Sequence, residues 1–245
     1  MTWGASSAMA QCARTITADV VALDQAFFWN RLGAVQPQGM MFALRRDVES
    51  IDSAYGLQPG NVQLREGKRP RPLVLRMNVG DCLSIQFQNL LATSPADSQQ
   101  PATRTASIRA LGLQLVNSIA SDGSNVGANA SSLVAPGGSA TYTFYAEREG
   151  SHLLYSAAAT TGGEGDGGSI NAGLFGAVTV QPAGAEWYRS QITNADLALA
   201  TTGTTPGGQP IINYNAVYPQ GHALAGLPIL KMLNGTQIVH SDLTA

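Results

Sequence analysis

The stretch that decides the fold reads VGDCLSIQFQN and covers residues 79–89. After the turn signal Asn78-Val79-Gly80-Asp81, apolar and polar side chains alternate from Leu83 to Phe87. Because successive residues of a strand point to opposite faces of a sheet, this alternation predicts a strand with one buried face. The residues before the turn, 72–77 (PLVLRM), predict another strand.

Working outward from this stretch, further strand-like segments recur along the chain. They are rich in Val, Thr, Tyr, Phe and Leu and are separated by Gly, Pro, Asn and Asp, with turns expected at 121–125 and 135–139. The sequence between 33 and 60 is mixed, and residues 48–55 predict a loop or a short helix. Strands at this spacing predict an all-β sandwich, with segments at 15–23, 40–44, 72–77, 82–90, 107–116, 140–146, 150–156 and 173–180.

The bulk composition agrees with this fold class and excludes two kinds of partner. Charged residues make up 12% of the 245 residues, and there are 27 glycines, whereas about 25% charged residues is average for a soluble domain. The formal net charge is −2 and the Lys and Arg residues are scattered. We therefore expect no binding to nucleic acid or to an anionic membrane surface. No apolar run approaches the roughly 18 residues of a membrane-spanning helix.

Three regions are expected along the chain. Residues 1–11 suggest the remnant of a leader, because Ala8-Met9-Ala10 has the small-x-small pattern of a signal-peptidase site without the usual basic and apolar segments before it. Residues 12–182 form the predicted sandwich. Residues 183–245 are expected to be a mostly irregular extension: a linker, with a Thr/Gly-rich part at 200–210, and the start of a truncated following domain. A hairpin turning at Asn234-Gly235 is expected within it. We expect the chain to be a fragment or a truncated gene product.

The two cysteines, Cys12 and Cys82, allow one disulfide that closes a loop of about 70 residues. Two buried free thiols are the alternative. A bridge between the openings of two neighbouring strands is geometrically easy, and it would place the protein in an oxidising compartment, secreted or periplasmic.

Several segments, taken in order, resemble the first cupredoxin domain of multicopper oxidases. The resemblance covers about residues 12–182 and implies a Greek-key cupredoxin-like sandwich. The segments that carry it are VGDCLSIQFQN (79–89), SIRALGL (107–113), SDG (121–123), APGGSATYTF (135–144), GSHLLYS (150–156) and GLFGAVTV (173–180).

The resemblance fails where the family binds copper. The family has a His-x-His pair on each of two strands, and these positions hold Arg109, Leu111, Tyr155 and Ala157 here. Arg, Leu and Ala offer no donor atom to a metal, and a lone phenol is a poor ligand. We therefore expect no catalytic, cofactor-binding or metal-binding residue in this chain. An Arg at a formerly inward-facing position should find a carboxylate or a wet cleft.

The three histidines do not replace the missing ligands. His152 lies three residues before a family ligand position and is expected to be a surface or half-buried strand residue. His222 and His240, the latter near Asp242, are expected to be solvated, with a stray metal pair as the alternative. Cys82 has no histidine nearby downstream, so a blue-copper site is not expected.

Weaker signals have structural readings. The segment GGEGDGG (162–168) could hold a hard cation through its two carboxylates, but it is expected to be a mobile loop. Met40 and Met41 point to opposite faces of a strand and are expected to pack in cores. Asn129 and Asn234 each begin a glycosylation sequon.

Three functions are considered for a chain with these features. The first is a copper-free N-terminal domain of a longer multicopper oxidase, packed against other cupredoxin domains of the same polypeptide, with copper and oxidoreductase activity expected in those domains. The second is a stand-alone module that binds protein or carbohydrate without redox activity. The third, an active copper enzyme in its own right, conflicts with the missing ligands.

Overall fold

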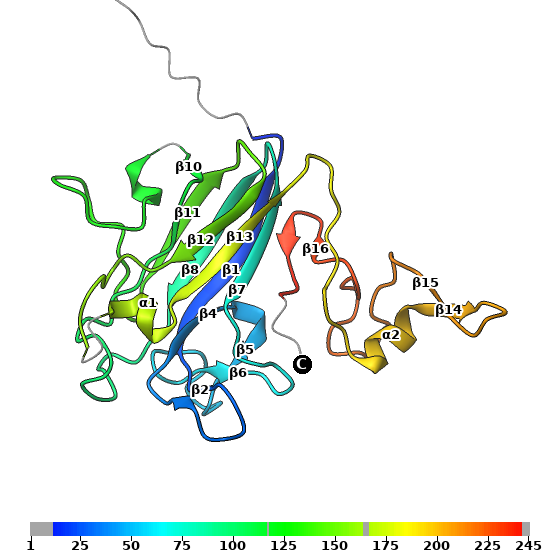
Figure 1. Ribbon diagram of the computed structural model, residues 1–245, viewed down its shortest axis with the longest axis horizontal. Helices are drawn as coiled ribbons and strands as arrows, with labels where there is room; N and C mark the ends of the chain where they lie inside the picture. The colour runs from blue at the N-terminus through cyan, green and yellow to red at the C-terminus, as the bar shows by residue number, and fades with distance from the viewer. Residues whose placement is uncertain (1–11, 117, 164–166, 242–245) are drawn as a thin grey trace, which may run out of the picture.

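The computed structural model describes residues 12–116, 118–163 and 167–241, and two facing sheets form its main body (Figure 1). The first sheet has the order β10-β11-β8-β1-β17-β16, with β4 also paired to β1. Its long strands are β4 (Met40–Leu44), β1 (Thr15–Asp24), β8 (Cys82–Asn89) and β11 (Ser139–Tyr145), and its short ones are β10 (Gln114–Leu115), β16 (Leu233–Asn234) and β17 (Gln237–Ile238).

The second sheet has the order β7-β13-β12-β9. It consists of β7 (Leu73–Asn78), β13 (Phe175–Gln181), β12 (Gly150–Tyr155) and β9 (Arg109–Ala110). The pairs β1/β8 and β7/β13 are parallel, whereas β4/β1, β8/β11, β12/β13 and β12/β9 are antiparallel. Strands that neighbour each other in a sheet are mostly not consecutive in the chain, so the connections cross between sheets. The predicted all-β sandwich is confirmed.

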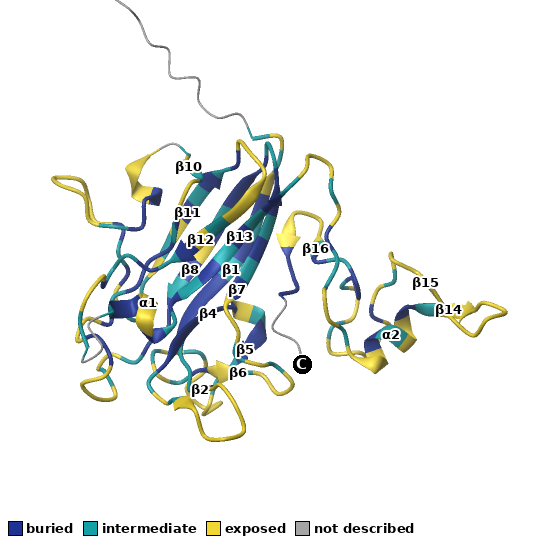
Figure 2. Ribbon diagram, viewed as in Figure 1, coloured by how far each residue is buried: buried dark blue, intermediate teal, exposed yellow. Residues whose placement is uncertain are grey.

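The core lies between the sheets and follows the alternation seen in the sequence (Figure 2). In β8, Leu83, Ile85 and Phe87 are buried, while Gln86 between them is exposed. The ring centre of Phe87 lies 6.0 Å from that of Phe42, in an edge-on contact, and 6.1 Å from that of Tyr142. Aromatic pairs favour ring separations of this size. The half-buried strand predicted at residues 82–90 is therefore present.

The two adjacent methionines pack on opposite sides of β4. Met40 belongs to the main cluster between the sheets, and Met41 belongs to a second cluster with Val21, Leu23 and Phe27. This matches the expectation that both residues serve as packing groups.

One predicted strand is wrong in extent. Residues 107–116 do not form a single strand, because β9 ends at Ala110 in the second sheet and β10 begins at Gln114 in the first. Gly112, between them, has a φ of 89°, a left-handed conformation that a continuous strand does not adopt. Alternation alone could not reveal the change of sheet.

The smaller elements cover the ends of the sandwich. Residues 48–55, expected to form a loop or a short helix, begin with a short strand at Val48 and continue as a turn. These elements are β2 (Phe27–Phe28), β3 (Val35–Gln36), η1 (Arg45–Asp47), β5 (Val48–Glu49), β6 (Gln63–Leu64), η2 (Ile119–Ser121) and α1 (Gly168–Ala172).

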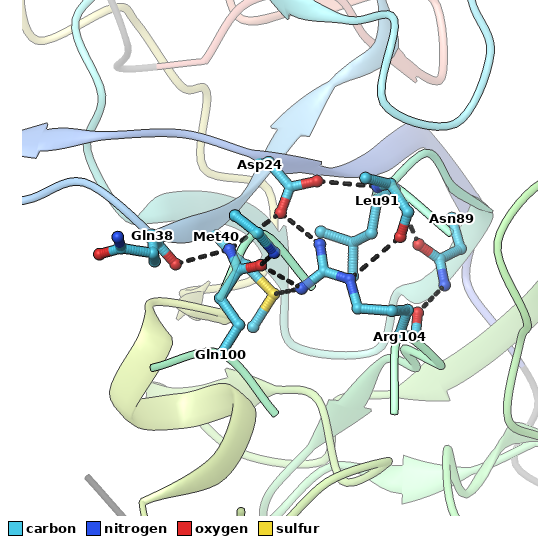
Figure 3. A network of polar contacts seen from close by, with 9 residues as sticks. Asp24, Gln38, Met40, Asn89, Leu91, Gln100 and Arg104 are labelled. Atoms are coloured by element: carbon cyan, nitrogen blue, oxygen red, sulfur yellow. Dashed lines mark hydrogen bonds and ion pairs between the residues drawn. The ribbon is translucent and has the colours of Figure 1, made fainter. Parts of the chain in front are cut away.

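A buried polar network fastens the loop at 91–105 to the sandwich (Figure 3). The Arg104 guanidinium is paired with the Asp24 carboxylate at the end of β1 and donates to the Ala92 carbonyl at 3.0 Å and to the Gln100 side chain at 3.0 Å. It also approaches the Met40 sulfur at 3.3 Å. Most of the donors of Arg104 are thus used inside the protein, and the loop is held by side chains rather than by strand pairing.

The C-terminal extension is mostly irregular, as predicted, but it contains several short regular elements. Besides β16 and β17 it holds α2 (Asn194–Ala200), β14 (Thr201–Thr204) and β15 (Pro210–Ile212). The stretch at 200–210 that was expected to be linker is therefore largely a hairpin strand and its turn. A small cluster of Ala200, Tyr218, Ile229 and Leu230 is its own core.

The end of this extension returns to the first sheet. The strands β16 and β17 form the predicted hairpin, but its turn is Gly235-Thr236 rather than Asn234-Gly235, because Asn234 is still paired with Gln237. The strand β17 runs parallel to β1 with Gln237 opposite Thr17. The Thr17 amide donates to the Thr236 carbonyl at 2.9 Å. Since β4 pairs only with the later half of β1, from Val20 onward, β17 covers the edge that β4 leaves open. That residues 183–245 begin a following domain stays a prediction.

The two cysteines are joined. Cys12 and Cys82 form a disulfide with their Cα atoms 5.3 Å apart, at the point where β1 and β8 pair in parallel from Thr15. The predicted leader at residues 1–11 lies outside the described residues. Within the described ranges, no helix is long and apolar enough to cross a membrane.

Candidate functional site

The four positions at which the family pattern has histidines cluster on β9, β12 and the residues that follow them. Arg109 and Tyr155 are directly opposite each other, so their side chains share one face of the second sheet. The Leu111 amide donates to the Leu153 carbonyl at 2.8 Å, and the Ala157 amide donates to the Ser107 hydroxyl at 3.1 Å. The fold therefore brings the four positions together.

The face that they occupy is the outer one, which corrects the expectation for Arg109. Its neighbour Ala110 and the residue before Tyr155, Leu154, are both buried in the core between the sheets. Because side chains alternate along a strand, Arg109 and Tyr155 point away from that core. The sequence indicates this outward direction, because Arg109 alternates with the apolar residues Ile108 and Ala110.

Arg109 forms an ion pair with a carboxylate. This was predicted because burying an unpaired charge is unfavourable. Its guanidinium lies 3.0 Å from the Asp122 carboxylate, which is largely buried, and the Ser124 hydroxyl donates to the same carboxylate oxygen. Gly123, between Asp122 and Ser124 in the sequence, has a φ of 74°. A Cβ at this position would lie 2.1 Å from the Ile108 carbonyl oxygen. The Asp-Gly turn can therefore pass close to β9 only with glycine at this position.

This set of side chains does not suit copper. A guanidinium offers no lone pair, Leu111 and Ala157 have no donor atom, and Tyr155 would be a single phenol ligand. Elsewhere in the described chain, no three residues of the types His, Cys, Asp or Glu gather closely enough to hold a metal ion.

The rest of the outer face is partly apolar. Val74, Ala177 and Leu153 form a row across β7, β13 and β12, and Leu111 extends it. Leu153 is 42% exposed and Leu111 is 56% exposed. We call this set of residues, with the Arg109–Asp122 pair beside it, the outer face of the second sheet.

His152 is a half-buried strand residue, as predicted. Its Nδ1 lies 3.0 Å from the Leu111 carbonyl oxygen, to which it can donate a hydrogen bond. A Cβ at Gly112 would lie 2.9 Å from the same nitrogen. His152 therefore supports the turn that leads out of β9.

The two histidines of the extension do not both match the prediction of solvated side chains. His240 is 4% exposed, its Nε2 donates to the Pro228 carbonyl at 2.6 Å, and burial lowers the pKa of its imidazole from 6.5 to about 4. His222 is exposed and stacks on Tyr218 with ring centres 4.4 Å apart. The prediction is thus wrong for His240, because the return of the chain to β1 encloses this residue.

Tyr218 links these histidines to an ion pair. Its hydroxyl donates to the Asp196 carboxylate at 2.7 Å and accepts a hydrogen bond from Arg189 at 3.1 Å, while Arg189 and Asp196 lie 3.2 Å apart. Burial, followed by the hydrogen bond to Asp196, raises the pKa of the Tyr218 hydroxyl. This cluster fastens α2 to the loop around Tyr218.

Two further features predicted from the sequence are the possible cation-binding segment and the glycosylation sequons. Within the segment 162–168, residues 164–166, which include both carboxylates of the possible cation site, lie outside the described residues. Asn129 and Asn234, the two sequon residues, are exposed.

Comparison with known proteins finds similarity in structure alone. No family model matches the sequence, and no curated protein matches it. Among solved structures, a multicopper oxidase from Pseudomonas thermotolerans is 19% identical with a TM-score of 0.43, covering 71% of this chain and 31% of the oxidase. A copper nitrite reductase from Nitrosomonas europaea is 18% identical with a TM-score of 0.41, covering 74% of this chain and 45% of the reductase.

A third structure, a blue copper oxidase from Nitrosomonas europaea, is 14% identical with a TM-score of 0.41, covering 70% of this chain and 40% of the oxidase. This chain thus spans less than half the length of each of these proteins. At such identities and TM-scores the likeness carries no conclusion about activity, and the fold rests on the strand order described above. The structure itself shows an all-β sandwich of two facing sheets.

Proposed function

We propose that this chain is a copper-free N-terminal cupredoxin domain of a secreted multicopper-oxidase-like protein, with a structural role in packing against other domains of that polypeptide. The observation that carries the proposal is the Arg109–Asp122 ion pair. Arg109 and Leu111 occupy the places of the first histidine pair, and Tyr155 and Ala157 occupy those of the second. In this proposal, copper and the oxidoreductase activity belong to the other domains.

The outer face of the second sheet supports a packing role. Its exposed leucines, Leu111 and Leu153, flank a salt bridge whose Asp122 is largely buried. The core of a protein interface is more apolar than the rest of the protein surface and is enriched in Arg. The disulfide between Cys12 and Cys82 supports the proposed export to the cell exterior or the periplasm.

Copper binding tests the first part of the proposal. The purified protein is incubated with Cu(II), dialysed, and analysed for metal content and for visible absorption. We expect neither the blue thiolate absorption nor stoichiometric copper. One firmly held copper per chain would overturn the proposal.

A variant with histidine at all four positions (Arg109→His, Leu111→His, Tyr155→His, Ala157→His) is the matched control. Imidazole is a good copper ligand, and these positions lie together on β9 and β12. We expect this variant to retain Cu(II) through dialysis that strips the natural protein. Circular dichroism of both proteins checks that they share one fold.

The alternative is a stand-alone binding module, and the same exposed face would serve it. Reading the transcript past the codon for Ala245 separates the two. Further cupredoxin repeats with His-x-His and His-Cys-His motifs support the domain role, whereas a stop codon in an intact gene favours the module.

A further inference from the structure

A small ring-lined pocket lies at the end of the sandwich where β2 and β3 meet the start of β13. Its volume is about 110 Å³. Aromatic, proline and methionine side chains form most of its wall, and the polar groups are two amides. The lining residues are Phe27, Trp29, Gln36, Met41, Pro70, Pro72, Asn171, Gly173 and Phe175.

The aromatic wall is fixed by local structure. Phe27 pairs with Gln36 across the β2/β3 ladder, and its ring stacks on Trp29 with centres 5.3 Å apart and planes 10° apart. A Cβ at Gly173 would lie 2.8 Å from the Phe27 ring, so glycine leaves the room that this ring needs. The wall is thus held in place by contacts within the protein.

The pocket has no charged lining residue. Its polar groups are the side chains of Gln36 and Asn171, and Gln36 Nε2 donates to the Asn171 backbone carbonyl at 3.3 Å. That bond leaves the Gln36 side-chain oxygen and the Asn171 side-chain amide available to a ligand at the rim. Apolar walls with a few placed polar groups are the general form of small-molecule sites.

We propose that this pocket binds a single uncharged six-membered aromatic ring that carries one hydrogen-bonding group. An apolar cavity of about 150 Å³ is known to hold benzene, so the observed volume suits one ring whose edge reaches the opening. Trp29, 63% exposed, is the open wall against which that edge would stack. The ring's polar group would meet Gln36 or Asn171.

Size and charge separate this ligand from other classes. A sugar ring presents hydroxyl groups in several directions, and this pocket has two amides to satisfy them, so most would be buried unpaired at a cost. A proline-rich peptide needs an extended groove for several residues, whereas this volume suits one ring. A carboxylate on the ring would have no cation among the lining residues.

The test titrates the full chain with benzyl alcohol, toluene or benzoate. Binding is measured from the NMR chemical shifts of the backbone amides around Phe27, Gln36 and Phe175. We expect saturable binding of benzyl alcohol with shifts confined to these segments. Benzoate is expected to bind at least roughly tenfold more weakly, because its charge would be desolvated without a partner. The proposal is overturned if benzyl alcohol shows no saturable binding here.

Two variants and a matched control locate the site. Trp29→Ala should weaken benzyl alcohol binding roughly tenfold or more, because it removes the stacking wall. Gln36→Leu should weaken benzyl alcohol roughly three- to tenfold, the effect of one neutral hydrogen bond, and leave toluene binding unchanged. Phe28→Ala is the control, since Phe28 is 75% exposed and does not line the pocket. It should leave both probes unaffected.

The outcomes are decisive in either direction. Retained affinity in Trp29→Ala, with thermal unfolding unchanged from the natural protein, contradicts the assignment. Tighter binding at this site of a glucan oligosaccharide or a proline-rich peptide than of benzyl alcohol also contradicts it and assigns another ligand class. The test involves neither Arg109 nor copper, so its failure leaves the proposed structural role untouched.

Discussion

Arg109 stabilises the turn at Asp122 through an ion pair. Its guanidinium shares the outer face of the second sheet with Tyr155 and balances the Asp122 carboxylate. Asp122 is mostly enclosed by the turn through Gly123. A charged pair of this kind matters most when one partner is removed, because the other charge then stays in a poorly solvated place.

Replacing Arg109 by Met should therefore lower the free energy of unfolding by about 1–2 kcal/mol, a moderate value because the guanidinium is itself partly exposed. Urea unfolding followed by circular dichroism measures the change. Combining it with Asp122→Asn should cost less than the sum of the single changes. Strictly additive losses would show that the pair does not interact.

His240 is the residue whose titration should affect stability most clearly. Burial, together with the nearby cations Arg189, Arg46 and Lys68, lowers the pKa of its imidazole to about 4, against the effect of its bond to the Pro228 carbonyl. The unfolded chain, with a pKa near 6.5, then binds a proton more readily than the folded one. Stability should consequently fall as the pH drops from about 6.5 towards 4.

The loss over that range should be of the order of 3 kcal/mol, since one pKa unit corresponds to about 1.4 kcal/mol. Urea unfolding midpoints at several pH values measure it. A His240→Gln variant should show a shallower pH dependence than the natural protein in this range, and His222→Gln, at an exposed position, should not. Equal slopes for all three proteins would refute the assignment to His240.

At the scale of elements, side chains hold the long loop at 91–105 in place of strand pairing. Arg104 connects this loop to Asp24 at the end of β1 and to the Met40 sulfur in β4 (Figure 3). Asn89, at the end of β8, donates to the Arg104 carbonyl at 2.8 Å. The loop thereby joins three strands of the first sheet.

Substituting Arg104 by Met should lower the free energy of unfolding by about 3 kcal/mol, because it leaves Asp24 and the Gln100 side chain without their main partner. The same change should make the loop a preferred site of limited proteolysis. Mass spectrometry of the fragments locates the cuts. Arg31→Met, at an exposed position outside the network, is the control and should change neither property. An uncut loop in Arg104→Met would argue against the clamp.

On the scale of the whole molecule, two long-range links join the ends of the described chain to the first sheet. The Cys12–Cys82 disulfide ties the start of the described chain to β8, and β17 ties the end of it to β1. Since β1 and β8 are neighbours, both termini of the described chain are held at the same pair of strands (Figure 1).

The disulfide spans 70 residues, so its loss should reduce the free energy of unfolding by about 4 kcal/mol in the chain-entropy description. The double variant Cys12→Ser, Cys82→Ser measures this in urea against the natural protein. In the natural protein, thiol titration in denaturant without reductant should detect no free thiol. Two reactive thiols would show that the bridge does not form.

The sequence by itself determined the local features of this protein. Alternation at residues 79–89 and its repetition along the chain predicted the strands and the sandwich, because side-chain direction in a strand follows directly from residue order. The resemblance of the ordered segments to a cupredoxin domain implied that positions 109, 111, 155 and 157 lack the histidines of that family. The two cysteines allowed one disulfide between Cys12 and Cys82.

Only the tertiary structure decided which distant residues meet. Arg104 and Asp24 are 80 positions apart, the pocket joins residues from 27 to 175, and His240 is enclosed because the chain returns to β1. The residues 107–116 alternate as one strand would, yet a turn at Gly112 divides them between the two sheets. The same physical reason applies to these four cases. The periodicity of a sequence gives the direction of each side chain within its own strand. Burial and charge pairing depend on contacts between segments that are far apart in the sequence, and periodicity does not show which segments meet.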